Sequence, residues 1–71
     1  MKEIVYIEMN YSNAILNMSK LPKNDLIYIE YDDGSYSTTS PATLKNMKIP
    51  KELEEARQEV LFDLKSRNVK F

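Results

Sequence analysis

Apolar residues recur along the first ten positions of the chain, and they predict a β-strand from Lys2 to Met9. By the two-residue period of a strand, one face carries Val5, Ile7 and Met9. The other face carries Ile4, Tyr6 and Glu8. Because apolar residues occur on both faces, we expect this strand to lie in the centre of a sheet rather than at its edge.

A β-hairpin is the clearest local signal in the sequence. The segment from Leu26 to Asp32 runs into Asp33-Gly34 and continues as a second segment, Ser35 to Thr39. Asp-Gly is a preferred pair for the two-residue type I′ turn, since both turn positions need a positive φ. The second segment is rich in serine and threonine, which is typical of a strand at the edge of a sheet.

The predicted turn also sets the pairing of the two hairpin strands. It places Tyr31 opposite Tyr36 and Ile29 opposite Thr38. The isoleucine-rich face of the hairpin is the expected core face, and it would carry Ile27, Ile29, Tyr31, Tyr36 and Thr38.

Capping signals predict two short helices. Ser12 is a candidate N-cap for a helix from Asn13 to Lys20. Ser40 followed by Pro41 has the pattern of an N-cap and a first helical residue. A short helix is therefore expected to begin there and to run through about Asn46.

The segment from Lys51 to Arg67 has the pattern of an amphipathic helix. Acids concentrate in its first turn and cations in its last, which is the favourable order for the helix dipole. Apolar residues at helical spacing form one stripe, made of Leu53, Ala56, Val60, Leu61 and Leu64. We expect Asn68 to end the helix in a left-handed conformation, so that the last three residues fold back.

Together these elements predict one α+β domain over residues 1–71 with the order β-α-β-β-α. We expect a small three-stranded, mainly antiparallel sheet with the long C-terminal helix packed on one face. The sequence alone does not determine which strand the first strand pairs with. A chain of 71 residues is too short for two cores, and a domain of this size buries only roughly 60% of its unfolded surface. Its stability margin is therefore thin.

The composition removes several kinds of chemistry. The chain has no cysteine and no histidine, so it lacks disulfides, thiolate nucleophiles and imidazole acids or bases. Zinc and copper sites usually need those residues as ligands. We therefore expect a protein that is not an enzyme and that holds no cofactor and no metal. Self-association is the remaining way to widen the stability margin.

Charge and hydropathy narrow the partners and the location. Ten Lys and Arg against eleven Asp and Glu give a net charge of −1, whereas a dedicated nucleic-acid binder usually has a basic excess. Glu3 and Glu8 interrupt the N-terminal apolar residues, so no signal peptide is expected, and no segment approaches the ~20 apolar residues of a membrane span. We expect a soluble, cytoplasmic protein that does not contact a membrane.

The long helix carries the first candidate binding surface. Four acids fall within about 80° of one another on a helical wheel, namely Glu52, Glu55, Glu59 and Asp63. Phe62 lies beside them and away from the apolar stripe. An aromatic residue flanked by acids is typical of a surface that binds a protein partner. The alternative is a solvated acidic face, with Phe62 covered by the C-terminal tail or by a second protomer.

A second acidic group lies at the predicted hairpin tip and comprises Glu30, Asp32 and Asp33. It is the next candidate contact for a protein partner. The alternative is ordinary turn chemistry together with a charged edge that prevents aggregation.

Lysines and tyrosines suggest the chemistry of a different partner. Lys45, Lys48 and Lys51 form the only local basic run and would contact phosphates if the protein bound nucleic acid. Of the tyrosines, we expect Tyr6 and Tyr28 on one sheet face, and Tyr31 and Tyr36 on the other. Because no lysines are interleaved with them, we interpret these tyrosines as sheet stabilisers rather than as a platform for bases.

The sequence thus predicts a small non-catalytic intracellular protein that acts by binding another protein or a second copy of itself. On size and economy alone, the class to search first is phage or mobile-element inhibitors of a host protein or defence system. The alternative is a homodimeric regulator, similar to antitoxins, that contacts nucleic acid through the three lysines.

Overall fold

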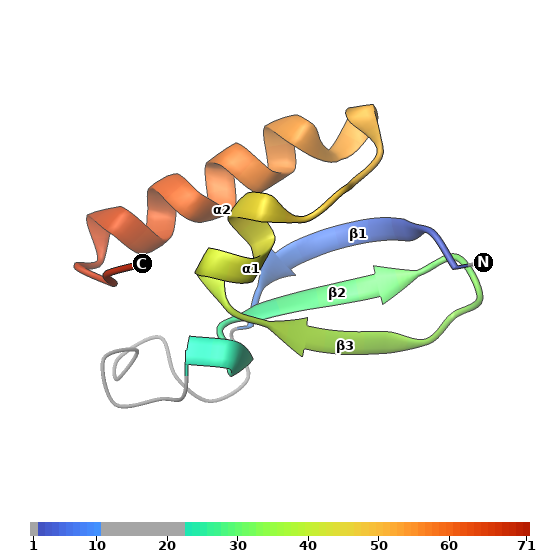
Figure 1. Ribbon diagram of the computed structural model, residues 1–71, viewed down its shortest axis with the longest axis horizontal. Helices are drawn as coiled ribbons and strands as arrows, with labels where there is room; N and C mark the ends of the chain where they lie inside the picture. Colours follow the sequence, from blue (N-terminus) through green and yellow to red (C-terminus); the bar gives the residue numbers. More distant parts are fainter. Residues whose placement is uncertain (1, 11–22) are drawn as a thin grey trace.

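A computed structural model of the chain describes residues 2–10 and 23–71. Within these residues, three antiparallel strands form one sheet, in the spatial order β1-β2-β3, and two α-helices follow them (Figure 1). The strands are β1 (Ile4–Met9), β2 (Ile27–Tyr31) and β3 (Tyr36–Thr39). The helices are α1 (Pro41–Asn46) and α2 (Glu54–Ser66), with single 3-10 turns η2 (Lys23–Asp25) before β2 and η3 (Lys51–Leu53) before α2. The predicted helix from Asn13 to Lys20 lies outside the described residues.

The predicted α+β fold is confirmed in its sheet and its long C-terminal helix. The core lies between one face of the sheet and the two helices, and α2 runs along the β1 side of the sheet (Figure 1). Its most deeply buried side chains are Leu26, Ile27, Ile29, Leu44 and Leu64. Val60 and Leu61 join them from α2, which confirms the predicted apolar stripe.

β1 lies at an edge of the described sheet and β2 is the central strand, so the prediction of a central first strand was wrong. An irregular pairing with β2, and not burial on both sides, explains the apolar residues on both faces of β1. Its pairing with β2 shifts between Ile4 and Tyr6, which makes Val5 the extra residue of a β-bulge. Val5 and Tyr6 are both about half exposed. The second apolar face of β1 is therefore a surface and not a second core.

The β2–β3 hairpin closes with a three-residue loop, and the predicted two-residue turn was wrong. The Gly34 N–H donates to the Tyr31 carbonyl at 3.0 Å, and the Tyr31 N–H donates to the Ser35 carbonyl at 2.8 Å. Gly34 has a φ of 85°, whereas Asp33 keeps a negative φ. This is a type I turn followed by a glycine bulge. The need for a positive φ therefore falls on Gly34 alone.

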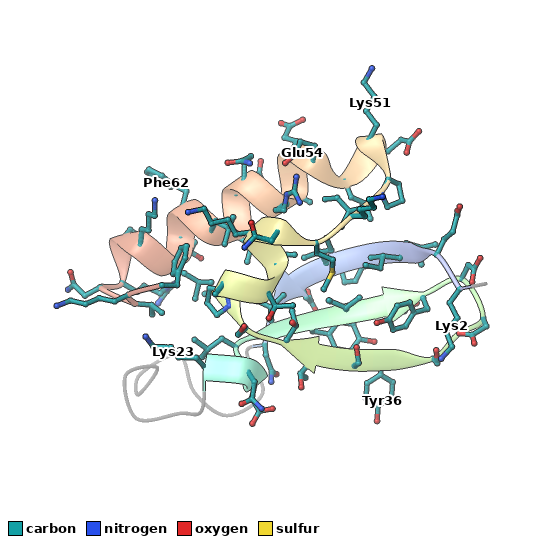
Figure 2. The ribbon with its side chains drawn as sticks, in the orientation of Figure 1. Lys2, Lys23, Tyr36, Lys51, Glu54 and Phe62 are labelled. Carbon is teal, nitrogen blue, oxygen red and sulfur yellow. The ribbon has the colours of Figure 1, made fainter. Side chains whose placement is uncertain are left out.

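The longer loop moves the register of β3 by one residue relative to the prediction. Thr38 lies opposite Tyr28, and Tyr36 lies opposite Glu30. A slip of one residue turns every side chain of a strand to the other face. Tyr36 and Thr38, which were predicted on the core face, point away from it, and Thr39 is buried instead. Figure 2 shows Tyr36 projecting from β3 on the side away from α2.

The Ser40 cap and the left-handed Asn68 are confirmed, whereas the long helix, predicted from Lys51, begins with the 3-10 turn η3 and becomes α-helical at Glu54. The Ser40 hydroxyl accepts the Thr43 N–H at 3.1 Å and caps α1. After α2, Asn68 has a φ of 65°, and the Val69 N–H donates to the Leu64 carbonyl at 3.0 Å. These two features define a Schellman motif. It returns the chain to the core, where Val69 is buried.

We expect Gly34→Ala to lower the free energy of unfolding by about 1 kcal/mol, because an alanine at a φ of 85° is strained. The cause is the backbone alone, since a Cβ at this position would meet no atom within 4 Å. Gly34→Asn is the matched control, because asparagine adopts the left-handed conformation more readily, and it should cost less. Urea unfolding followed by circular dichroism measures both losses, and equal losses would contradict this loop geometry.

Candidate functional site

Phe62 is the most exposed large apolar side chain of the described residues, at 74%. It projects from α2 away from the sheet (Figure 2). The C-terminal tail does not cover it, because Val69 is buried and Phe71 packs against the core while Phe62 stays exposed. The alternative in which the tail shields Phe62 is therefore wrong.

A hollow of about 250 Å³ lies beside Phe62, and it is lined by Lys45, Gln58, Leu61, Phe62, Lys65 and Phe71. The Lys65 ammonium lies 5.6 Å from the centre of the Phe71 ring, at cation–π distance. Phe62 thus has lysines on one side. On the other side of the helical wheel it has the exposed acids Glu55 and Glu59.

Arg57 holds α1 against α2 and so brings Lys45 to this hollow. The half-buried Arg57 guanidinium donates to the Met47 carbonyl, which follows α1, at 2.7 Å. It also pairs with the Glu54 carboxylate. The hydrogen bonds from Arg57 and Gln58 lower the pKa of Glu54. Arg57 thus links the end of α1 to α2 through its hydrogen bond to Met47, close to the point where Lys45 borders the hollow.

The predicted acidic stripe of the helix is only partly available to a partner. Exposed members are Glu52, Glu55 and Glu59. Asp63 is half-buried and pairs with Arg67 at 3.0 Å. Glu59 and Asp63 also line a groove between α2 and β1, which Ile7, Glu8 and Met9 border from the strand.

The three acids predicted at the hairpin tip are not brought together. The Asp33 carboxylate accepts the Ser35 N–H at 2.9 Å and lies 3.7 Å from the Lys2 ammonium. The hydrogen bonds from Ser35 lower the pKa of Asp33, so this side chain is part of the turn. Glu30 lies on the sheet, whereas Asp32 and Asp33 are both exposed in the loop.

The three lysines of the nucleic-acid alternative line different surfaces. Lys45 borders the hollow beside Phe62, whereas Lys48 borders another hollow with Lys2 and Tyr31. Lys51 begins η3, before α2, and points into solvent (Figure 2). The basic run in the sequence therefore does not form one basic patch.

A row of three tyrosines, one from each strand, crosses the sheet on the face turned away from the core. The rings of Tyr6 and Tyr28 meet edge to face at 6.4 Å, and those of Tyr28 and Tyr36 stack at 5.7 Å. The prediction that Tyr6 and Tyr28 share a face is confirmed. The prediction that Tyr31 and Tyr36 share the other face was wrong, because of the register of β3. We define the tyrosine face as Tyr6, Glu8, Tyr28, Glu30, Tyr36 and Thr38.

Two carboxylates hold the tyrosines of this face in place. The Tyr6 hydroxyl donates to Glu8 at 2.7 Å, and the Tyr28 hydroxyl donates to Glu30 at 3.1 Å. The hydrogen bond to Glu8 is the main cause that raises the pKa of Tyr6. Partial burial, followed by the hydrogen bond to Glu30, raises the pKa of Tyr28. Both hydroxyls therefore remain donors well into the alkaline range.

Sequence reasoning missed this row because it counted two residues in the hairpin loop. The signal was present in the run Asp32-Asp33-Gly34, where a glycine in third position suits the type I turn with a bulge. That reading places Tyr36 on the same face as Tyr28.

No group of acids within residues 2–10 and 23–71 is placed to hold a metal ion. No helix in that part of the chain is long and apolar enough to span a membrane. Comparison with protein-family models, with curated proteins and with solved structures finds no match. The surfaces described above are the features of the molecule that bear on its function.

We expect Glu8→Gln to lower the pKa of Tyr6, because it removes the charged acceptor of the Tyr6 proton. Glu30→Gln is the matched variant and should lower chiefly the pKa of Tyr28, because it removes the acceptor of the Tyr28 proton. An NMR titration of the ring resonances between pH 8 and 12 measures both. An unchanged Tyr6 titration in Glu8→Gln would contradict the hydrogen bond.

Removing the Glu8 acceptor also changes how the stability of the protein depends on pH. A tyrosine whose pKa is raised in the folded state stabilises the fold fully below the unfolded value of about 10. That contribution is lost as the pH rises through the raised pKa. Glu8→Gln should therefore reduce the stability of the protein at neutral pH, and by less in strong alkali.

Proposed function

We propose that the protein is a non-catalytic binding protein whose main contact is the surface of α2 around Phe62. The observation that carries this proposal is the exposure of Phe62, at 74%, on a helix whose other large apolar residues are buried. Moving an exposed phenylalanine out of water contributes roughly 1.5–3 kcal/mol. Aromatic residues of this kind are the usual anchors of protein interfaces.

The surroundings of Phe62 support a protein partner. The hollow beside it can receive an apolar side chain, because Leu61 and Phe71 are part of its lining. Glu59 and Lys65 provide charges of both signs around the anchor. An apolar centre with a polar rim is the common anatomy of such interfaces. We also propose Asp32 at the hairpin as a secondary contact.

We further propose that the protein is an inhibitor of a host protein or defence system, encoded by a phage or a mobile element. A single small domain that only binds its target is the economical form of such an inhibitor. The alternative, a homodimeric regulator that contacts nucleic acid, has weaker support because Lys45, Lys48 and Lys51 lie on separate surfaces.

We expect Phe62→Ala and Glu59→Lys each to abolish capture of the partner while leaving the free energy of unfolding within about 0.5 kcal/mol of the parent. Both side chains are exposed, so neither change opens a cavity. The measurement is affinity capture from the native host with mass-spectrometric identification, paired with thermal unfolding. Glu3→Lys, the same charge reversal at an exposed position before β1, is the matched control and should retain the partner.

Three results would count against this proposal. Unfolding of either variant would show that the side chain has a structural role. Undiminished capture by both variants would move the interface elsewhere. A gel shift at low salt that weakens steeply as the salt concentration rises would favour the nucleic-acid alternative. Light scattering measures the molecular mass of the protein and so tests for a dimer. If the parent is a dimer and Phe62→Ala is a monomer, the partner is a second copy of the chain.

A further inference from the structure

The tyrosine face has no layer packed on it among the described residues, because α1 and α2 both lie on the core side of the sheet. Tyr36 is 70% exposed and Tyr6 is 45% exposed. This surface is separate from the one around Phe62, which projects from the far side of α2 (Figure 2). A partner that covered Phe62 would leave the tyrosine face open.

The charges of this face all have one sign. Glu8 and Glu30 lie among the tyrosines, and no lysine or arginine is among the six residues of the face. At the end of β3 the Thr38 hydroxyl donates to the Asp25 carboxylate at 3.1 Å, which adds a third acid beside the row. The face therefore combines aromatic rings with carboxylates and is complementary to a positive charge.

The geometry of the row is already fixed before any partner arrives. The hydroxyls of Tyr6 and Tyr28 are bonded to Glu8 and Glu30, and Tyr36 stacks on Tyr28. Side chains held in this way lose little conformational freedom on binding. The rings are 6.4 and 5.7 Å apart, close to the ~6.6 Å that two residues of an extended chain span.

We propose that the tyrosine face binds an extended, cationic protein segment that carries arginine or lysine at alternate positions. Each positive side chain lies against a tyrosine ring, and the neighbouring carboxylate of Glu8 or Glu30 balances its charge. Arginine suits the site best, because its planar guanidinium stacks on a ring and donates to a carboxylate at the same time.

Single-stranded nucleic acid is the other occupant that exposed tyrosines on a sheet attract. The charges oppose it here, because phosphates would lie against the carboxylates of Glu8 and Glu30. The same rings with lysines between them would favour bases. With glutamates between them, they favour cations.

The test is an NMR titration of the whole chain with a capped pentapeptide that alternates arginine and threonine. The control peptide replaces each arginine by citrulline, which has nearly the same shape and no charge. We expect the arginine peptide to shift the ring resonances of Tyr6, Tyr28 and Tyr36 and to leave those of Phe62 unchanged. The citrulline peptide should bind far more weakly, and added salt should weaken the arginine peptide.

Matched variants separate the ring from the hydroxyl and a local charge from the overall charge. Tyr36→Ala should weaken binding about five-fold, whereas Tyr36→Phe, which keeps the ring, should change it less than two-fold. Glu30→Gln should weaken binding, whereas Glu3→Gln, the same loss of charge at an exposed position before β1, should not. If Tyr36→Ala fails to fold, the difference in binding between the two glutamine variants tests the proposal in its place.

The proposal is overturned if neither peptide binds at millimolar concentration or if both bind equally. It is also overturned if the shifts map to α2, or if an oligothymidine shifts the tyrosine rings more strongly than the arginine peptide does. None of these results affects the proposed role of Phe62, which is tested through a different surface.

Discussion

The length of one loop determines what the two faces of the sheet display. Gly34 takes the single positive φ that the β2–β3 loop requires, and the chain turns over three residues. That choice pairs Tyr36 with Glu30 and turns it out of the core. A loop shorter by one residue would bury Tyr36 beside Tyr31 and leave Tyr28 without its stacking partner. The tyrosine face is thus a consequence of backbone geometry at a glycine.

The sheet and the helices give the molecule two exposed surfaces of different chemistry. On the core side, Ile27 and Ile29 form one buried cluster with Leu44 and Leu64. Phe62 is the large apolar residue of α2 that lies outside this core. On the other side, the tyrosines stabilise the sheet through cross-strand contacts and remain reachable. A domain this small buries a limited apolar surface, so a large apolar side chain left outside the core is a loss of stability that binding to a partner could explain.

The sequence predicted those elements that local chemistry determines. The apolar stripe of α2, the Ser40 cap and the left-handed Asn68 depend on neighbours within a few residues, and all three are confirmed. The edge position of β1 was not predictable from its apolar pattern, because a bulge at Val5 leaves exposed apolar residues on a strand that has one buried face. The pairing of β3 depended on choosing between two turns that the same Asp-Gly pair permits.

The candidate surfaces were predictable to different degrees. The helical wheel placed Phe62 outside the apolar stripe, and the structure shows it exposed. It could not show that Lys45 would border the same hollow, because that contact depends on how Arg57 joins α2 to the end of α1. The sequence also could not distinguish the roles of Glu30 and Asp33, because Glu30 bonds to Tyr28 on the sheet and Asp33 bonds to Ser35 within the turn.

The most direct test of this account is a measurement of nuclear Overhauser contacts between tyrosine rings in the free protein. The register described here predicts cross-peaks between the rings of Tyr28 and Tyr36, and between those of Tyr6 and Tyr28. Cross-peaks between the rings of Tyr31 and Tyr36, with none between Tyr28 and Tyr36, would show the two-residue turn. That result would contradict the tyrosine face and the inference drawn from it.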